Sequence, residues 1–191
     1  EIASDDLKQY FQREALPELA FTPDAEYGVC NREKGILHVE LSAPADGSRL
    51  ESLHGGTVRN AVAASARAEA RCTAEECEAL EALSKKMDGK FSFQWSGGVL
   101  TAECAGRAAH AMEPQKGRNA AARLVRLFSS CFGGEALGAL WSFVDQKIGL
   151  ELDGSSLGLR REDAVSGPLT VNLGVAEQDN GVCRAVLDIR Y

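Results

Sequence analysis

The 191-residue sequence lacks the features that mark several large classes of protein. It has no apolar run near the roughly 18 residues that a membrane-spanning helix needs. Its 21 basic residues are outnumbered by 28 acidic ones and form no basic stripe, which argues against a nucleic-acid partner because phosphate binding depends on clustered Lys and Arg. Its 45% hydrophobic content argues against disorder. We therefore expect a globular protein, of one large or two small domains, that binds neither membrane nor nucleic acid.

Familiar catalytic motifs are also missing. There is no G-x-S-x-G, no G-x-G-x-x-G and no P-loop. The only histidines are His38, His54 and His110, and none stands in an H-x-x-x-H or H-x-D pattern, so a zinc site made by this chain alone has little support. The six cysteines include no C-x-x-C pair. We interpret them mainly as small hydrophobic residues buried in a reducing, cytoplasmic compartment.

Helical and extended patterns alternate along the chain. Residues 57–71 are ambiguous, because their many alanines favour a helix whereas the alternation of Val62 with Ala64, Ala66 and Ala68 favours a strand. The remaining elements that we predict are a helix within 1–20, a strand at 35–42, a polar loop at 43–56, a helix opened by Thr73, a hairpin of 90–96 and 98–106, helices at 118–132 and 135–148, and a closing hairpin of 168–175 and 182–190.

This order predicts an α+β fold with a largely antiparallel sheet and helices packed on one face. The two halves of the chain share a loose layout, so an internal duplication into two similar ferredoxin-like (βαββαβ) halves is a further expectation.

His110 is the histidine with the strongest claim to chemistry. It follows a strand, is flanked by Ala109 and Ala111, and precedes Pro114. Such small neighbours would leave the imidazole free, although a loop histidine with ordinary hydrogen bonds fits the same pattern. For His38, which lies in an alternating strand, we expect only a place on the polar face of the sheet.

Four stretches together resemble one enzyme family: FTPDAEYGVCNREKG, GRAAHAMEPQKGRNAA, LTVNLGV and VLDIRY. They are similar to segments of the dinuclear zinc metallopeptidases that include aminoacylase, carnosinase and carboxypeptidase G, above all the PepV-type dipeptidases. They occur in the family's order and cover nearly the whole chain. In that family a zinc-binding catalytic domain is interrupted by a lid, or dimerisation, domain. The resemblance implies that residues 1–31 are a remnant of the catalytic domain and residues 32–191 are the lid.

The resemblance also implies roles for five residues. Glu1 and Asp24 match zinc ligands of the catalytic domain. His110 matches the lid histidine that stabilises the oxyanion of the tetrahedral intermediate. Asn60 matches a lid asparagine that donates toward the substrate, although Ala63 stands where the family usually has proline. Arg190, in an Asp-x-Arg pattern, matches the arginine that binds the substrate's C-terminal carboxylate; a solvated arginine at a strand end is the alternative.

Several parts of the family's zinc site have no match in this chain. The resemblance therefore implies a parent dipeptidase with two zinc ions that hydrolyses dipeptides or short peptides, of which this chain would be an inactive fragment that binds no zinc tightly. Its partners would be the peptide substrate and its own catalytic domain, and apolar surface exposed by excision would favour artificial self-association.

Two alternatives remain. One is a non-catalytic α+β binding or dimerisation module on the same scaffold. The other is an inactive family member, since Gly28 and Cys30 depart from the apolar residues expected there.

Overall fold

The computed structural model describes residues 5–20, 28 and 32–191, and the chain divides into two compact units, residues 1–33 and 34–191. In the first unit, α1 (Asp5–Phe11) is the helix predicted within residues 1–20. Its Tyr10 and Phe11 rings meet edge to face at 5.4 Å. Whether this unit is a catalytic-domain remnant ending at residue 31 stays a prediction.

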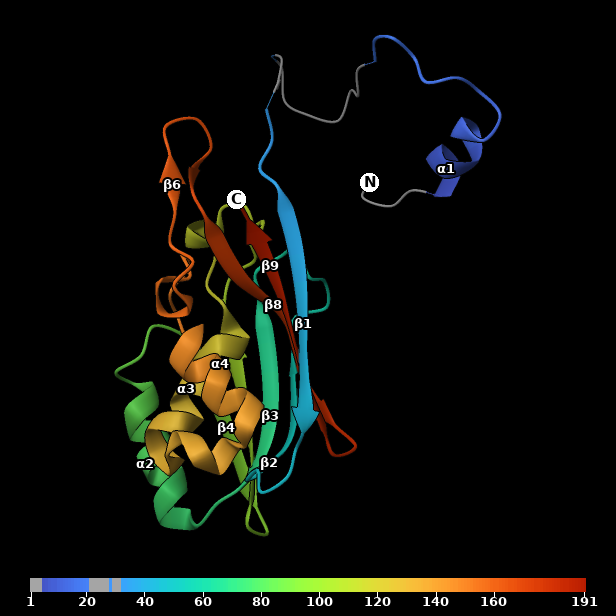
Figure 1. Cartoon of the computed structure of the whole chain (residues 1–191). Helices are drawn as coiled ribbons and strands as arrows, with labels where there is room; N and C mark the ends of the chain where they lie inside the picture. Colours follow the sequence, from blue (N-terminus) through green and yellow to red (C-terminus); the bar gives the residue numbers. More distant parts are fainter. Residues whose placement is uncertain (1–4, 21–27, 29–31) are drawn as a thin grey trace. The chain divides into compact units, whose positions relative to one another are not determined.

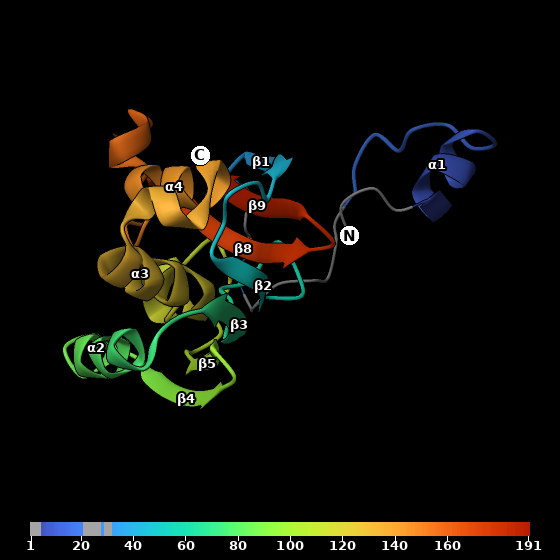
Figure 2. The same cartoon turned by 90° about the horizontal axis from the view of Figure 1, so that it is seen from below.

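The second unit is built on an antiparallel seven-stranded sheet with the order β1-β9-β8-β2-β3-β5-β4 (Figure 1). The helices lie together on one face of this sheet, with α3 across the middle strands and α4 over β1 and β9 (Figure 2). The predicted α+β class is confirmed, whereas the ferredoxin-like halves stay a prediction. The strands are β1 (Ile36–Pro44), β2 (Leu50–Gly55), β3 (Ser65–Arg71), β4 (Lys90–Ser96), β5 (Val99–Ala105), β8 (Thr170–Asp179) and β9 (Val182–Arg190), and the helices are α2 (Ala74–Ser84), α3 (Ala120–Phe132) and α4 (Ala139–Lys147).

Short elements complete this unit. Three 3₁₀ turns occupy Pro114–Lys116, Gly134–Leu137 and Ser155–Leu157, and β6 (Glu162–Asp163) pairs with β7 (Gly167–Pro168) in a separate two-stranded ribbon. None of the helices in the described part of the chain is long and apolar enough to span a membrane.

The ambiguous stretch resolves as a strand. In β3 the side chains of Ala66, Ala68 and Ala70 are buried toward the helices, while Arg67 points to the opposite face. The two-residue period therefore prevails over the helix propensity of alanine, because only a strand buries every second alanine. The helix predicted after Thr73 is also confirmed, and Thr73 and Glu76 form a reciprocal capping box at its start.

Two predictions about local structure are wrong. Residues 43–56 are not simply a polar loop, because Leu50–Gly55 forms β2 between β8 and β3. A register shift between Leu50 and Ser52 interrupts the alternation that would have revealed this strand. The single helix predicted at 135–148 is split, because Gly138 (φ 82°) separates a 3₁₀ turn from α4.

The two faces of the sheet differ in chemistry. Strand β9 sends Cys183, Ala185, Leu187 and Ile189 into the core beneath the helices. The residues between them face the other way, on what we call the open face. The five described cysteines are all free, and four of them are buried in the core, as the sequence predicts; Cys30 lies outside the described residues.

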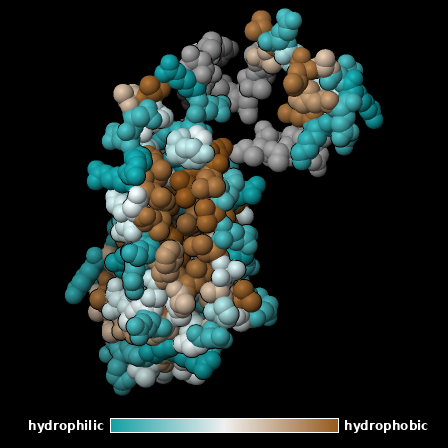
Figure 3. Space-filling model, viewed as in Figure 1, coloured by the Kyte–Doolittle hydropathy of each residue, from teal (hydrophilic) through white to brown (hydrophobic). Residues whose placement is uncertain are grey.

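Apolar residues also reach the surface of the second unit. In the view of Figure 3 they gather in the middle of the surface, near α4 and the strands beside it. The exposed large apolar residues of this unit include Leu37, Phe143, Leu150, Leu159 and Tyr191. Self-association of the chain through such surface stays a prediction.

Candidate functional site

The segment that carries Asn60 lies directly against β8. A Cβ atom added to Gly174 would collide with the backbone carbonyl of Arg59, and one added to Gly56 would collide with the carbonyl of Gly174. Glycine is required at both positions because two backbones cross there without room for a side chain. A bulge in β8 between Leu173 and Val175 brings Gly174 to this crossing.

Asn60 and His110 are neighbours although fifty residues separate them in sequence. Ala61 and His110 form an isolated antiparallel bridge. The Ala111 N–H donates to the Asn60 carbonyl at 3.0 Å, and the Val62 N–H donates to the Ala109 carbonyl at 2.9 Å. Both Asn60 and His110 are exposed. The bridge therefore brings the backbone of residues 60–62 against that of residues 109–111, with both Asn60 and His110 at the surface.

The hydrogen bonding of His110 determines which ring nitrogen can donate. The Met112 N–H donates to His110 Nδ1 at 3.1 Å. A neutral imidazole that accepts at Nδ1 carries its hydrogen on Nε2. His110 is therefore set up to donate a hydrogen bond from Nε2.

Two buried side chains of β8 fix this bridge to the sheet. Asn172 Nδ2 donates to the Ala61 carbonyl at 2.9 Å, and Thr170 Oγ1 donates to the Ala111 carbonyl at 3.1 Å. Thr170 is also the register partner of Arg190 on β9. Asn60, His110 and Arg190 are thus all connected to the same end of β8.

Arg190 is not the solvated strand-end arginine that was the alternative interpretation. It is 7% exposed, and its guanidinium makes a bidentate ion pair with Asp188 (Nε–Oδ1 2.5 Å, Nη2–Oδ2 2.9 Å). His38 Nε2 lies 3.0 Å from the same Asp188 Oδ2. His38 does lie on the polar face of the sheet, as predicted, but it also belongs to this buried cluster.

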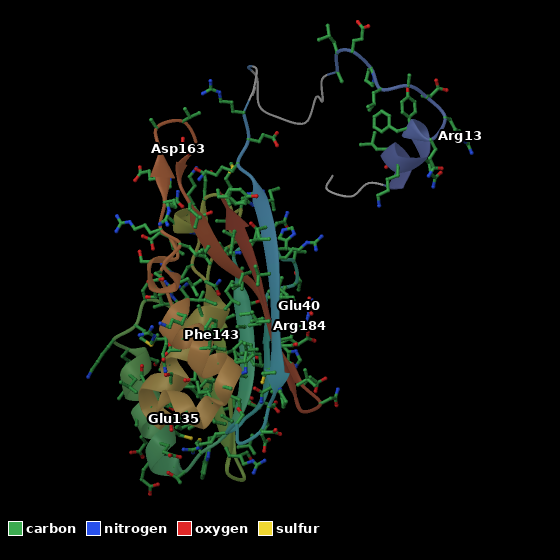
Figure 4. The ribbon with its side chains drawn as sticks, in the orientation of Figure 1. Arg13, Glu40, Glu135, Phe143, Asp163 and Arg184 are labelled. Atoms are coloured by element: carbon green, nitrogen blue, oxygen red, sulfur yellow. The ribbon has the colours of Figure 1, made fainter. Side chains whose placement is uncertain are left out.

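A cleft of about 800 Å³ opens beside this cluster on the open face. His38, His54 and Asn60 line it, so the cleft extends from the exposed asparagine to His38, which contacts the buried Asp188. Glu40 and Arg184 form an ion pair of 2.9 Å at the wall formed by β1 and β9 (Figure 4). The hydrogen bond from Arg184 lowers the pKa of Glu40, which keeps that carboxylate ionised.

Asp188 is the residue of this site to which sequence reasoning gave no role. The sequence does indicate that Asp188 lies near Arg190, because the two residues are two positions apart in a predicted strand and therefore share a face. Asn172 and Thr170 carried no comparable signal, since their partners are backbone carbonyls of distant loops.

The two predicted zinc ligands, Glu1 and Asp24, lie outside the described residues. Within residues 5–20, 28 and 32–191, no group of three or more His, Cys, Asp or Glu side chains is placed to hold a metal ion. These residues therefore do not by themselves fit a zinc site, and zinc ligands would have to come from elsewhere.

Comparison with known proteins shows that the chain is similar to bacterial dipeptidases. The chain is 29% identical to Putative dipeptidase YtjP of Bacillus subtilis over 97% of its length, and 26% identical to the Beta-Ala-Xaa dipeptidase of Lactobacillus delbrueckii over 95%. A putative dipeptidase of Staphylococcus saprophyticus is 26% identical over 91% of the chain. The chain is homologous to these dipeptidases.

This homology confirms the resemblance to PepV-type dipeptidases. The chain spans 42%, 40% and 39% of the lengths of these three relatives, in the order given, so it corresponds to part of each. No protein-family model matches the chain.

Proposed function

We propose that this chain is the lid part of a zinc-dependent dipeptidase, which closes over the active site and binds a dipeptide or short peptide. The observation that supports the proposal is the backbone bridge between Ala61 and His110, which is tied to the end of β8 where Thr170 pairs with Arg190. The homology to dipeptidases gives this geometry its chemical context.

The three side chains would perform different tasks. Arg190 would bind the C-terminal carboxylate of the peptide, since a guanidinium matches a carboxylate in charge and in fork geometry. The Nε2–H of His110 and the amide of Asn60 would donate to the scissile carbonyl, where negative charge develops during hydrolysis. Donors that are fixed in advance lower the barrier because they need no reorganisation as the charge forms.

The zinc ions of the proposed enzyme would be held by a longer protein of which this chain is a part. The relatives, of which the chain spans about two fifths, support this. The isolated 191-residue chain is accordingly proposed to be inactive and to bind no zinc tightly. A cytoplasmic location and the metal-ligand roles of Glu1 and Asp24 stay predictions of the resemblance.

The test is dipeptide hydrolysis by the full-length protein and by the 191-residue chain in the same zinc-containing buffer. We expect turnover only with the full-length protein. His110→Ala should lower kcat about 100- to 1000-fold, the usual cost of removing one oxyanion donor. Lys116→Ala, an exposed change in the same loop, is the control and should leave kcat unchanged.

Three outcomes would contradict the proposal. A full-length protein that binds peptides without hydrolysing them would support the non-catalytic module instead. Full activity of His110→Ala would remove the role given to that residue. Hydrolysis by the 191-residue chain, abolished by His110→Ala, would show that it is a complete enzyme.

A further inference from the structure

The ion pair between Asp188 and Arg190 is unusual in its burial and in its completeness. Asp188 is fully buried, and both of its carboxylate oxygens are hydrogen-bonded. Oδ1 accepts from Arg190 Nε, and Oδ2 accepts from Arg190 Nη2 and from His38 Nε2. The three side chains come from adjacent strands, and His38 is the register partner of Asp188 on β1.

The hydrogen bonds of this cluster link His38 to Asp188 and Asp188 to Arg190. A carboxylate only accepts hydrogen bonds, so His38 must carry its hydrogen on Nε2 and donate it to Asp188. His38 therefore holds Asp188, and Asp188 in turn holds the guanidinium of Arg190. The side chain of His38 is 21% exposed and lines the cleft, so the chain of contacts leads from the cleft to the arginine.

The way Arg190 is held leaves part of its guanidinium for a ligand. A guanidinium has five N–H donors in a planar fork. Asp188 takes the side-on pair, one N–H on Nε and one on Nη2. The end-on fork of Nη1 and Nη2 has no hydrogen bond to the other described residues. A second carboxylate could therefore bind there without breaking the first ion pair.

We propose that Asp188 and His38 are positioning residues, which orient Arg190 so that its end-on fork meets the carboxylate of the substrate. This inference rests on the proposed function, because it takes the carboxylate-binding role of Arg190 from there. Orientation in advance raises affinity because the long arginine side chain loses its freedom on folding and not on binding.

Stability alone gives a weak account of this cluster. Removing a carboxylate from water costs free energy that an ion pair recovers only in part, so apolar residues would often serve a core equally well. Here the neighbouring positions Leu187 and Ile189 are apolar and face the helices, whereas the charged pair faces the side where Asn60 and His110 lie. The placement fits a role in binding.

The experiment compares an ordinary dipeptide with its C-terminal amide as substrates of the full-length protein. The ratio of the two kcat/KM values measures how strongly the enzyme recognises the carboxylate. We expect Asp188→Asn to reduce this ratio about tenfold or more, and His38→Leu to reduce it about three- to tenfold, with kcat/KM for the amide unchanged. A merely structural role would instead lower both values together.

Two further variants make the comparison sharper. His38→Gln keeps an N–H donor at similar reach and should restore part of the ratio. Glu69→Gln removes a carboxylate from β3 on the same open face, where it pairs with Arg67 and does not touch Arg190. This control should leave the ratio unchanged.

A measurement on the 191-residue chain tests the positioning without catalysis. Hydrogen exchange of the Arg190 Nε–H, followed by NMR, should accelerate about tenfold in His38→Leu and remain unchanged in Glu69→Gln. Equal protection in wild type and His38→Leu would overturn the positioning role. If wild type does not distinguish acid from amide, the proposed role of Arg190 fails; if it does but the variants keep the ratio, only the present inference fails.

Discussion

The two faces of the sheet are stabilised in different ways. Under the helices, fully buried Leu124, Phe128 and Val144 pack against alanines and leucines of the strands. On the open face, Asp188 and Asn172 are buried as well, but they are held by hydrogen bonds to side chains and to loop carbonyls. Burial alone therefore does not distinguish core from site in this protein; the kind of contact does.

This difference has a physical consequence. Apolar contacts have no direction, so the helix-covered side tolerates changes that preserve volume. Hydrogen bonds do have direction, so the open face keeps particular atoms in particular places. A binding site needs the second property, and the candidate site is found where that property dominates.

The largest loss of stability is expected from a substitution that leaves a cavity on the helix-covered side. Phe128→Ala should reduce the free energy of unfolding by about 3–5 kcal/mol, because a large aromatic side chain leaves an unfilled space. Phe143→Ala, on the exposed side of α4, is the matched control and should cost less than about 1 kcal/mol. Urea denaturation measures both. Equal costs would mean that the core under the helices does not dominate stability.

A smaller and more local loss of stability is expected at Gly174, where the segment that carries Asn60 lies against β8. Gly174→Ala should cost about 2–3 kcal/mol, because the new methyl group collides with the rigid carbonyl of Arg59. Gly134→Ala meets only the ends of flexible side chains and is the control. In addition, NMR shifts of Asn60 and His110 should move only in Gly174→Ala. Unchanged stability would show that the crossing of the two backbones is loose.

A modest dependence of the free energy of unfolding on pH is expected from Glu76 on the helix-covered side. The hydrogen bonds from Arg49 and from the Thr73 backbone lower the pKa of Glu76 from 4.5 to about 2. Because the folded pKa lies below the unfolded one, this contribution is fully present above pH 4.5 and is lost as the pH falls toward 2. It should amount to no more than about 1 kcal/mol, since the pair is partly exposed.

Thermal unfolding at pH 6 and at pH 3 tests this effect, with Glu76→Gln as the variant. The loss of stability between the two pH values should be smaller in the variant than in wild type. Glu78→Gln, an exposed change on the same helix, is the control. If Glu76→Gln has the same pH dependence as wild type, the ion pair with Arg49 contributes nothing measurable.

The last prediction is the formation of a disulfide between Cys72 and Cys77, from which we expect the smallest change in stability. Their Sγ atoms lie 2.7 Å apart, so diamide should join them: the thiols lose two hydrogen atoms, which reduce the N=N bond of diamide, and one S–S bond forms. Burial raises the pKa of Cys77 to about 12, so the reaction should be slow and accelerate with pH. Peptide mapping by mass spectrometry detects the linkage. Cys104 and Cys183 should stay unlinked to each other; reaction there first would contradict the prediction.

Much of the helix-covered side could be predicted from the sequence. Its strands and helices follow local rules, such as the alternation in β3 and the capping box at Thr73, which act within a few residues. Strand β2 escaped prediction because a register shift breaks its alternation. The split at Gly138 escaped because the helical pattern continues on both sides of it.

The site was predictable only in part. The shared face of Asp188 and Arg190 follows from their spacing, although the ion pair between them was not anticipated. The resemblance gives Asn60 and His110 roles toward the same substrate, but the sequence does not predict the bridge between their segments, because it links distant loops through backbone atoms. Backbone contacts leave little trace in the identity of the residues that make them.

The crossing of Gly56 and Gly174 also sets the kind of motion open to the molecule. Residues 56–61 are fixed to β8 by this crossing, by Asn172 and by the bridge to His110, so they have little freedom to move as a flap. An approach of Asn60 to a ligand must then carry the whole sheet along as a rigid body. Two probes, one at Val58 and one on α3, would keep a constant separation when a ligand is added.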